Sequence, residues 1–409
     1  MKILIINYFY PPVVNAHSYR WHEITKEWIR KGHKVDIITS ALLEHESDKK
    51  PNIMRVGWKK ESNSIMNSIG ENKSDRSSSS KLISTIKKIY RRFYWPDAWW
   101  FWIPSVFMAI FTKRKEEYNL IVSYYPCMAS VLAGVYYKIM NKDTRFIIDY
   151  GDPFSVSNTM QPNNYKLYSW LNSTLEQFIF KYADVVSFTN NRTLDLYLKK
   201  YKSNKFTVIP HLTNIEESYV SENLSGVQER FQIVYMGSFH KGIREPYELF
   251  SIISDVNKKF PLELIIYGPD NGFKLKEYES DCIKYFGMIS KDSLPSILKR
   301  AGAIVNVNNI NCCMTPSKIV EAISTGIPII NIKNKVNDDY ISEYESFGFA
   351  ISIDNNENHN ENVNSLISFL SKIKDCNRAP IETVRDILRD NDISIISDIY
   401  IKNAFKNKE

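Results

Sequence analysis

The 409-residue sequence predicts an α/β protein made of two Rossmann-like, doubly wound domains. The first observation is length, because a single hydrophobic core usually stops growing beyond about 250 to 300 residues. The second is a series of apolar strand patterns that alternate with helix patterns along the first half. The third is a new series of the same kind that begins at Phe231. Strands that alternate with helices form parallel sheets through right-handed crossovers.

The first series opens with an apolar strand over Met1–Tyr8, a loop with two prolines and a helix over Arg20–Lys31 that Gly32 closes. A strand over 33–39 follows, and this order is a βαβ unit. The apolar opening is short and ends at Pro-Pro, so we expect a buried first strand and no secretory signal. Further strands of this domain are expected over 120–123, 145–150 and 184–189.

Two unusual stretches lie inside the first domain. Residues 60–86 are polar and rich in Ser and Asn, which predicts a long mobile excursion. Residues 87–115 are aromatic and basic, but Asp97 and two prolines argue against a membrane span. Two interpretations stay open for this segment. Its Trp and basic residues face lipid headgroups from a surface helix, or its aromatic side chains pack in the core and at a domain interface.

Charge and cysteine content narrow the classes of partner. The net charge of +7 suits acidic partners such as phosphates or anionic lipids. It is too small to indicate nucleic acid, and the sequence carries no nucleic-acid-binding motif. The five cysteines show no metal-ligand spacing, so we expect reduced thiols, no metal site and a cytoplasmic protein. They are Cys127, Cys282, Cys312, Cys313 and Cys376.

The second series predicts a domain over 231–379, after a first domain over 1–212 and a linker over 213–230. Amphipathic helices are expected over 380–409. The expected strands are 231–236, 262–267, 285–287, 303–307 and 328–332, and the expected helices are 245–258, 294–300 and one that opens near Thr315. In such sheets a ligand lies beyond the carboxyl ends of the strands.

The loops at these strand ends favour an anion. Gly237, Gly268 and Gly287 allow the backbone to approach a ligand closely, and Lys241 and Arg244 supply two cations after the first strand. None of the apolar strands of this domain carries a cation. Cations at loops that meet on one edge of a parallel sheet indicate a diphosphate site.

The segment "TPSKIVEAISTGIPII" adds a third element to this edge. Thr315 and Pro316 are a typical helix opening, with a hydroxyl N-cap and proline at the first helical position. Lys318 stands where a capping box would have a carboxylate, against the positive end of the helix dipole. A phosphate bound at this helix start explains the lysine. Glu321 lies one turn further on the same face, where it could accept hydrogen bonds from ribose. Alternatively, Lys318 and Glu321 form an exposed ion pair of little consequence.

Four segments of the sequence together resemble a known family. The segments "MKILIINYFYPP", "YMGSFHKGIREP", "YFGMISKDSLPSILKRAGAIVNVN" and "PSKIVEAISTGIPII" resemble GT-B glycosyltransferases of the retaining family 4 type. The bacterial branch that builds capsule and O-antigen sugars is the most similar. The resemblance implies two Rossmann-like domains that face a central cleft, and C-terminal helices that cross back to the first domain. It also implies a nucleotide-sugar donor in the second domain, a glycan or lipid-linked acceptor in the first, and neither metal nor other cofactor.

Carried over residue by residue, the resemblance assigns donor contacts to the second domain. Lys241 and Arg244 are candidates for the diphosphate, although the family usually has its first cation directly after the glycine, where this chain has Ser238. The first glutamate of the family's E-x7-E motif would fall at Cys313. This departure bears on which group contacts the donor sugar. The implied donor-binding set is Gly237, Ser238, Lys241, Arg244, Gly268, Cys313, Pro316, Ser317, Lys318 and Glu321.

In the first domain the resemblance implies an acceptor site. The family's Gly-Gly loop is replaced by a segment that includes Asn15 and Ala16, and Arg20 begins the helix that follows. "FIIDYGDPFS" resembles a strand end of the family with Gly151 in place of the usual arginine. Its carboxylates, Asp149 and Asp152, are candidates to take the proton of the attacking hydroxyl, and strand-end capping is the alternative for Asp149. Tyr124 stands at a strand end that lacks the family's histidine.

The leading hypothesis is retaining hexosyl transfer from a nucleoside diphosphate sugar, with Asp149, Asp152, Lys318 and Arg244 as catalytic candidates. The cations would stabilise the leaving diphosphate, and domain closure would exclude water. The acceptor would be a lipid-linked or capsular glycan, so the protein could contact the inner face of the cell membrane. Two rivals stay open, a nucleotide-sugar epimerase of the same fold and a binding partner whose active site has decayed.

Overall fold

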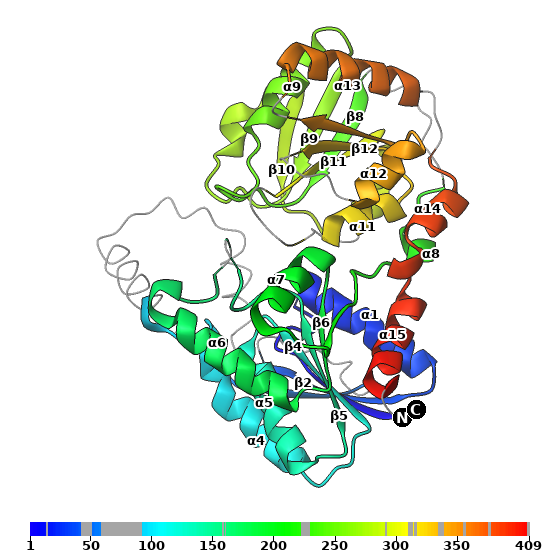
Figure 1. The fold of residues 1–409 in the computed structure, drawn as a ribbon. Coiled ribbons are helices and arrows are strands. Elements are labelled where there is room, and N and C mark those ends of the chain that lie inside the picture. Colours follow the sequence, from blue (N-terminus) through cyan, green and yellow to red (C-terminus); the bar gives the residue numbers. More distant parts are fainter. Residues whose placement is uncertain are drawn as a thin grey trace. The chain divides into compact units, whose positions relative to one another are not determined.

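The structure is a computed structural model that divides into two compact units, Met1–His211 with Ile393–Glu409 and Leu212–Asp392. It describes residues 1–13, 15–41, 51–58, 92–157, 159, 161–221, 230–290, 293–309, 314, 317–333, 339–354, 357–374 and 378–406. The expected excursion over 60–86 therefore lies outside the described residues. Figure 1 shows that each unit contains its own sheet with helices on both faces.

The first unit is built on a sheet of seven parallel strands in the order β3-β2-β1-β4-β5-β6-β7. Its central strands hold buried apolar runs, such as Ile3–Ile6 of β1 and Leu120–Val122 of β4, as is typical of strands that are buried on both faces. The strands are β1 (Lys2–Ile6), β2 (Lys34–Ser40), β3 (Asn52–Val56), β4 (Leu120–Tyr125), β5 (Arg145–Tyr150), β6 (Val185–Phe188) and β7 (Phe206–Val208).

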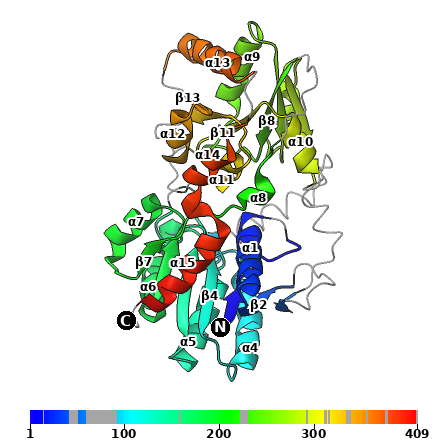
Figure 2. The ribbon, with the colours of Figure 1, turned by 90° about the vertical axis from the view of Figure 1, so that its right-hand side faces the viewer.

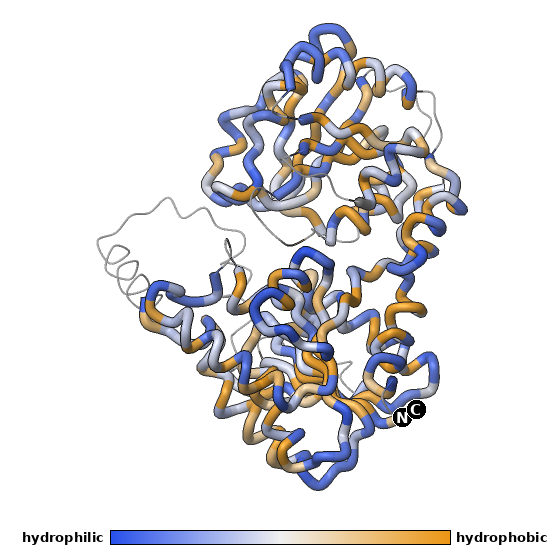
Figure 3. Tube along the Cα trace, viewed as in Figure 1, coloured by the Kyte–Doolittle hydropathy of each residue, from blue (hydrophilic) through white to orange (hydrophobic). Residues whose placement is uncertain are grey.

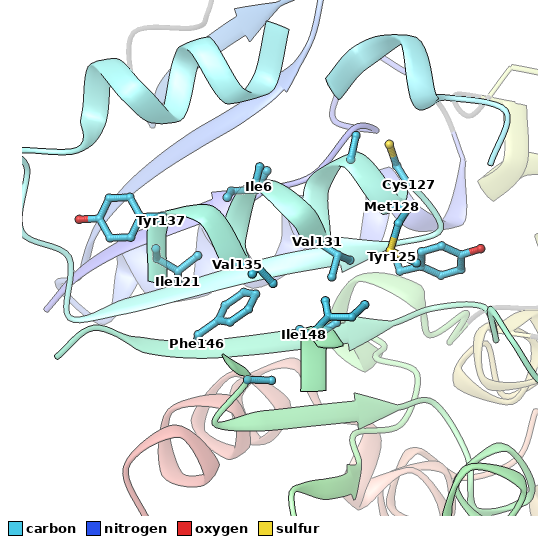
Figure 4. Packing of buried hydrophobic residues seen from close by; sticks show 14 of the residues in the cluster. Ile6, Ile121, Tyr125, Cys127, Met128, Val131, Val135, Tyr137, Phe146 and Ile148 are labelled. Atoms are coloured by element: carbon cyan, nitrogen blue, oxygen red, sulfur yellow. The ribbon is translucent and has the colours of Figure 1, made fainter. Parts of the chain in front are cut away.

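Helices cover both faces of this sheet. On one face, alternate residues of β1, β4 and β5 form one apolar cluster with side chains from α4 (Ile103–Lys113), α5 (Met128–Met140), α6 (Tyr165–Tyr182) and α7 (Asn191–Tyr201). Figure 4 shows Val131 and Val135 of α5 directed at Ile148 and Phe146 of the sheet. α1 (Ala16–Arg30) and α15 (Ile393–Phe405) lie side by side on the other face (Figures 1 and 2).

The second unit is built on six parallel strands in the order β10-β9-β8-β11-β12-β13. They are β8 (Phe231–Met236), β9 (Leu262–Tyr267), β10 (Ile283–Gly287), β11 (Ala303–Val307), β12 (Ile329–Lys333) and β13 (Ala350–Asp354). Apolar residues concentrate along these strands (Figure 3). Its helices and 3-10 turns are α8 (Ile215–Ser218), α9 (Tyr247–Asn257), η2 (Leu275–Tyr278), α10 (Leu294–Arg300), α11 (Ser317–Ser324), α12 (Asp339–Ser346), α13 (His359–Ile373), α14 (Ile381–Ile387) and η4 (Arg389–Asn391).

The predicted fold class is confirmed. Every strand expected from the sequence is present within a few residues of its expected bounds, and both sheets are parallel. The C-terminal region expected to return to the first domain divides in two. α14 belongs to the second unit, whereas α15 packs on the first. The Trp28 indole donates to the carbonyl of Ser397 at 3.0 Å, which joins α1 to α15.

Candidate functional site

Each sheet has one position where the strand order reverses direction, between β1 and β4 in the first unit and between β8 and β11 in the second. The loops that leave the two central strands at such a position diverge, and ligands of doubly wound sheets bind there. Nearly all of the residues that the sequence singled out lie at these two edges. We describe the two edges in turn.

Glycines hold the carboxyl ends of three strands of the second unit together. The amide of Gly237 donates to the carbonyl of Tyr267 at 2.9 Å, and the amide of Gly268 donates to that of Gly287 at 2.9 Å. A methyl group on Gly268, whose φ is +146°, would lie 1.9 Å from the carbonyl oxygen of Gly237. Only glycine fits at position 268, so this predicted glycine is needed for the close approach of backbone to backbone.

Lys318 reaches this glycine edge from the start of α11. Its ammonium donates to the carbonyl of Met236 at 2.9 Å, and a methyl group built on Gly237 would lie 2.9 Å from the same nitrogen. Desolvation of the ammonium lowers the pKa of Lys318, an effect that nearby Glu321 opposes and the Arg244 guanidinium reinforces. A cation is therefore held at the strand end beside a second cation, an arrangement that a bound anion would stabilise.

Arg244 joins the loops that follow β8 and β11, the two strands between which the strand order reverses. Its Nε and Nη2 donate to the Oδ1 of Asn309, which follows β11, at 3.1 and 2.7 Å. The loop that carries Arg244 is closed by two backbone bonds with His240, of 2.8 and 2.7 Å. Desolvation, together with Arg244 and Lys318, lowers the pKa of His240. Arg244 is thus tied to the residue after β11, whereas Lys318 is tied to the end of the neighbouring strand β8.

For the other predicted donor residues, the structure gives the burial of three and one backbone contact of a fourth. Lys241 is exposed in the same loop as Arg244, Glu321 is exposed on α11, and Ser317 is half-buried at the first position of that helix. Ser238 contributes its carbonyl, which accepts from the Tyr235 hydroxyl at 3.2 Å. The remaining two residues, Cys313 and Pro316, lie outside the described residues.

A buried amide network next to this edge was missed from the sequence. Asn306 of β11 donates to the Oδ1 of Asn308 at 2.8 Å and to that of Asn331 on β12 at 2.7 Å. Asn331 in turn donates to Ser352 of β13 at 2.9 Å. Buried amides need such partners, and the network fixes the strand end from which Asn309 meets Arg244. The available signal was asparagine inside an apolar strand pattern, "AIVNVNN".

In the first unit, two predicted acceptor residues are buried away from any ligand. Asp149 is 0% exposed, accepts from Arg20 Nε at 3.2 Å and from the Ser187 hydroxyl at 2.7 Å. The Arg20 guanidinium also donates to the Tyr400 hydroxyl at 2.6 Å. Although burial opposes its charge, Tyr400 and Asp149 raise the pKa of Arg20 above its ordinary value. The geometry therefore assigns this pair to holding α1, β5 and α15 together, and it argues against direct contact with an acceptor.

The Gly-Gly position of the resembled family is occupied here by a helix cap. The side chain of Asn15 accepts from the amide of Ser18 at 2.7 Å, which makes it the N-cap of α1. Ala16 is the first residue of the helix and is exposed. Asparagine is among the best N-cap residues, so α1 begins several residues earlier than the sequence predicted.

Asp152 forms a cluster with a histidine that sequence reasoning missed. The Nε2 atom of His17 lies 3.6 Å from Asp152 Oδ2, and its Nδ1 lies 2.9 Å from the Tyr124 hydroxyl. The His17 ring stacks on Phe9, with centroids 5.8 Å apart. A methyl group on Gly151 would lie 1.9 Å from the Tyr124 hydroxyl oxygen. The glycine that replaces the family's arginine thus makes room for the phenol that holds His17.

A buried carboxylate positions the loop that carries Asp152. Glu176 of α6 accepts from the hydroxyls of Tyr197 and Tyr201 at 2.8 and 2.7 Å. The Tyr197 hydroxyl accepts from the amide of Phe154 at 2.9 Å, and the Tyr201 hydroxyl lies 2.8 Å from that of Ser155. Desolvation raises the pKa of Glu176. Hydrogen bonds with side chains of α6 and α7 therefore fix the chain after β5.

The described part of the aromatic and basic segment has a buried side, which confirms packing in the core, and an exposed side, for which contact with lipid stays a prediction. One side, with Trp102, Val106 and Ile110, is buried against the core. The other side is exposed, and the guanidinium of Arg114 lies 3.8 Å from the ring centroid of Phe111. The exposed large apolar residues of this side are Trp100, Phe101, Met108 and Phe111. Across the described ranges, no helix is both long and apolar enough to cross a bilayer.

Comparison with known proteins establishes the fold. No family model matches the sequence, and no curated protein matches it either. Among solved structures, the chain is similar to sucrose-phosphate synthase from Thermosynechococcus elongatus, with 15% identity and a TM-score of 0.64. The similarity covers 99% of this chain and 98% of that chain. The fold is therefore GT-B.

Two further structures show how widely this fold is shared. The lipopolysaccharide outer core galactosyltransferase WaaB is 11% identical with a TM-score of 0.59, over 99% of both chains. A protein from Listeria monocytogenes assigned as a UDP-N-acetylglucosamine 2-epimerase is 11% identical, with a TM-score of 0.56. That similarity covers 100% of this chain and 97% of the other. Transferases and an epimerase share the architecture, so function has to be argued from the two edges.

Proposed function

We propose that this protein is a glycosyltransferase that moves a hexose-type sugar from a nucleoside diphosphate sugar to a glycan acceptor. The observation that carries the proposal is the cationic edge of the second unit. There Lys318 donates to the last residue of β8, and Arg244 donates to Asn309, which follows the neighbouring strand β11. A diphosphate matches this edge in charge and in the hydrogen bonds it can accept.

In the proposed reaction the diphosphate is the leaving group. The bond between the sugar carbon and the diphosphate oxygen breaks, and the oxygen keeps the electron pair. Lys318 and Arg244 stabilise the charge that develops there, which is the main electrostatic contribution to the rate. Glu321 on α11 accepts hydrogen bonds from the ribose. Stereochemical retention is part of the proposal and follows from the family that the sequence resembles.

The acceptor is assigned to the first unit. An acceptor hydroxyl forms the new bond to the sugar carbon and gives up its proton, which Asp152 takes as a general base. Asp152 is the better candidate because its side chain is 34% exposed, whereas Asp149 is fully buried in its pair with Arg20. No other cofactor is part of this mechanism.

We also propose that the acceptor is lipid-linked and that the exposed side of α4, together with the 3-10 turn Trp100–Trp102 before it, contacts an anionic membrane. The observation in support is the group Trp100, Phe101, Met108 and Phe111 beside Arg114, which combines apolar insertion with a cation. A role in assembling a surface polysaccharide such as capsule, O-antigen or lipopolysaccharide agrees with the function named for the structurally similar WaaB.

An epimerase is the second candidate, because one similar structure is assigned that activity. Epimerisation needs acid and base groups around the sugar of the bound nucleotide. Among the described residues, the imidazole at the cationic edge is that of His240, and no carboxylate of these residues forms an ion pair with it. Transfer is therefore the better-supported function.

A donor panel with product analysis tests the proposal. The protein is incubated with UDP-, GDP- and dTDP-sugars and a set of glycan acceptors, and products are identified by mass spectrometry and NMR. We expect one donor to yield a glycosylated acceptor and free nucleoside diphosphate. An isomerised donor would establish the epimerase instead. Donor binding without transfer to any acceptor or to water would indicate a decayed enzyme.

A further inference from the structure

The cluster of His17, Tyr124 and Asp152 is built like a binding site, and His17 is the member to which the sequence assigned no role. Three separate elements contribute to it, namely the start of α1, the end of β4 and the loop after β5. The cluster lies where the strand order of the first sheet reverses. The imidazole and the carboxylate are partly accessible, with 25% and 34% of their side chains exposed.

The two ring nitrogens of His17 face different partners, Tyr124 and Asp152. Desolvation raises the pKa of the Tyr124 hydroxyl well above its ordinary value, with Asp149 adding to the effect, so the phenol stays protonated. On the other side of the ring, the Asp152 carboxylate can only accept when it is ionised. In the Nε2–H tautomer, Nδ1 accepts from the Tyr124 hydroxyl 2.9 Å away, and the N–H lies on the side of the ring that faces Asp152.

The gap between His17 and Asp152 is too wide for a direct hydrogen bond. The two atoms lie 3.6 Å apart, whereas such bonds measure about 2.7 to 3.2 Å. One oxygen atom can lie about 2.8 Å from both, accepting from Nε2 and donating to the carboxylate. A hydroxyl group is a donor and an acceptor at once, so it satisfies both partners.

The surroundings of the gap favour a sugar over other hydroxyl compounds. Phe9 stacks on His17, and Trp99 packs edge-on against Phe9 with ring centroids 5.3 Å apart. Both aromatic residues are only partly buried. Aromatic faces next to a few well-placed polar groups are typical of sites for small polar ligands with an apolar face, such as pyranose rings.

We propose that His17 and Asp152 bracket one hydroxyl of an acceptor sugar, with Tyr124 holding the imidazole in the Nε2–H tautomer. His17 is then a binding residue that orients the hydroxyl, and Asp152 receives its proton. The catalytic role of Asp152 in this inference rests on the proposed glycosyl transfer. Binding of a sugar hydroxyl between His17 and Asp152 can be tested without any transfer.

The test is a histidine ¹⁵N NMR experiment on the whole protein. His17 is assigned by loss of its signals in His17→Gln, and methyl glycosides of glucose, galactose, mannose and N-acetylglucosamine are titrated in turn. We expect the Nε2–H tautomer and a shift of the His17 nitrogens with at least one glycoside, which Asp152→Asn abolishes. His22, on the same helix, serves as the internal control and does not respond. Silence of His17 with all four glycosides, or the opposite tautomer, overturns the proposal.

Kinetics separate this inference from the proposed function. With the active donor, His17→Gln lowers transfer at least about tenfold while donor binding stays unchanged, and His22→Gln leaves both unchanged. Full transfer by His17→Gln overturns the bracket but leaves the glycosyltransferase standing. A glycoside response at His17 without transfer from any donor leaves the bracket standing and removes the proposed function.

Discussion

The two switch-point edges share a topology but differ in their charge. In the second unit, Lys318 and Arg244 stand together at the edge, and Arg244 is held by a neutral amide. In the first unit, the central cation Arg20 is neutralised inside the protein by Asp149. What remains at that edge is an imidazole, a carboxylate and aromatic rings. The two edges therefore differ because the central cation of the first is paired in the interior, whereas Lys318 of the second is bonded to a backbone carbonyl.

The largest expected effect concerns the buried pair. Arg20→Met leaves Asp149 as an unpaired buried charge, so we expect the free energy of unfolding of the first unit to fall by about 3 to 5 kcal/mol. Denaturant unfolding measures the loss. Adding Asp149→Leu removes the unpaired charge and should restore most of the stability. If Arg20→Met alone lowers the free energy of unfolding by less than about 1 kcal/mol, Arg20 does not stabilise the fold. Contact with an acceptor would then again be the expected role of Arg20.

The next prediction concerns pH and the first unit. Burial raises the pKa of Asp97 to about 6, although its bonds from the amides of Met128 and Trp99 oppose the shift. A raised pKa means that the folded state binds the proton more tightly than the unfolded state. Its contribution to stability is therefore full below about pH 4 and is lost as pH rises through about 6, by roughly 3 kcal/mol.

The check is the stability difference between the wild type and Asp97→Asn, measured by urea unfolding at several pH values. The wild type should lose stability relative to the variant between pH 4 and 7, because only its carboxyl titrates. Parallel curves over that range would contradict the raised pKa. An exposed carboxyl variant, Glu117→Gln, serves as the control for the substitution.

A smaller effect is expected at Gly151. Ala would place a methyl group against the Tyr124 hydroxyl, so the phenol has to move away from His17. We expect a loss of about 1 to 3 kcal/mol in unfolding free energy. The same substitution in a Tyr124→Ala background should cost much less, since the clash is gone. An equal loss of unfolding free energy in the two backgrounds would show that contact with Tyr124 does not cause it.

The smallest expected effect is at the exposed side of α4. Met108→Asp with Phe111→Asp should lower binding to anionic vesicles by about tenfold, because two apolar contacts are replaced by negative charges. Co-sedimentation with phosphatidylglycerol vesicles measures binding. Leu198→Asp, on α7 of the same unit, is the matched control. Unchanged binding by the double variant would remove this face from the proposed membrane contact.

The fold was predictable from the sequence because its signals are local. Apolar strands such as "FQIVYM" and the glycines that follow them are read from neighbouring residues, and the structure places them as expected. Lys318 was also found locally, because a cation at a helix start conflicts with the helix dipole. These signals needed no knowledge of distant contacts.

The acceptor edge was less predictable because its pairs are far apart in the sequence. Nothing near Arg20 indicates that Asp149, 129 positions away, will neutralise it in the interior. Nothing near His17 indicates that Tyr124 and Asp152 will meet its two nitrogens. Cys313, the departure that bears on the donor sugar, lies outside the described residues, so its role stays a prediction.

The most direct test of the cationic edge is calorimetric titration of UDP, GDP and dTDP into wild type and Lys318→Ala. We expect one nucleotide to bind the wild type and its dissociation constant to rise about 30-fold in the variant, through loss of a charge-assisted contact. The melting temperature should stay nearly unchanged. Lys259→Ala, an exposed lysine at the opposite edge of the sheet, should bind like the wild type. Equal affinity of Lys318→Ala and the wild type would contradict the account.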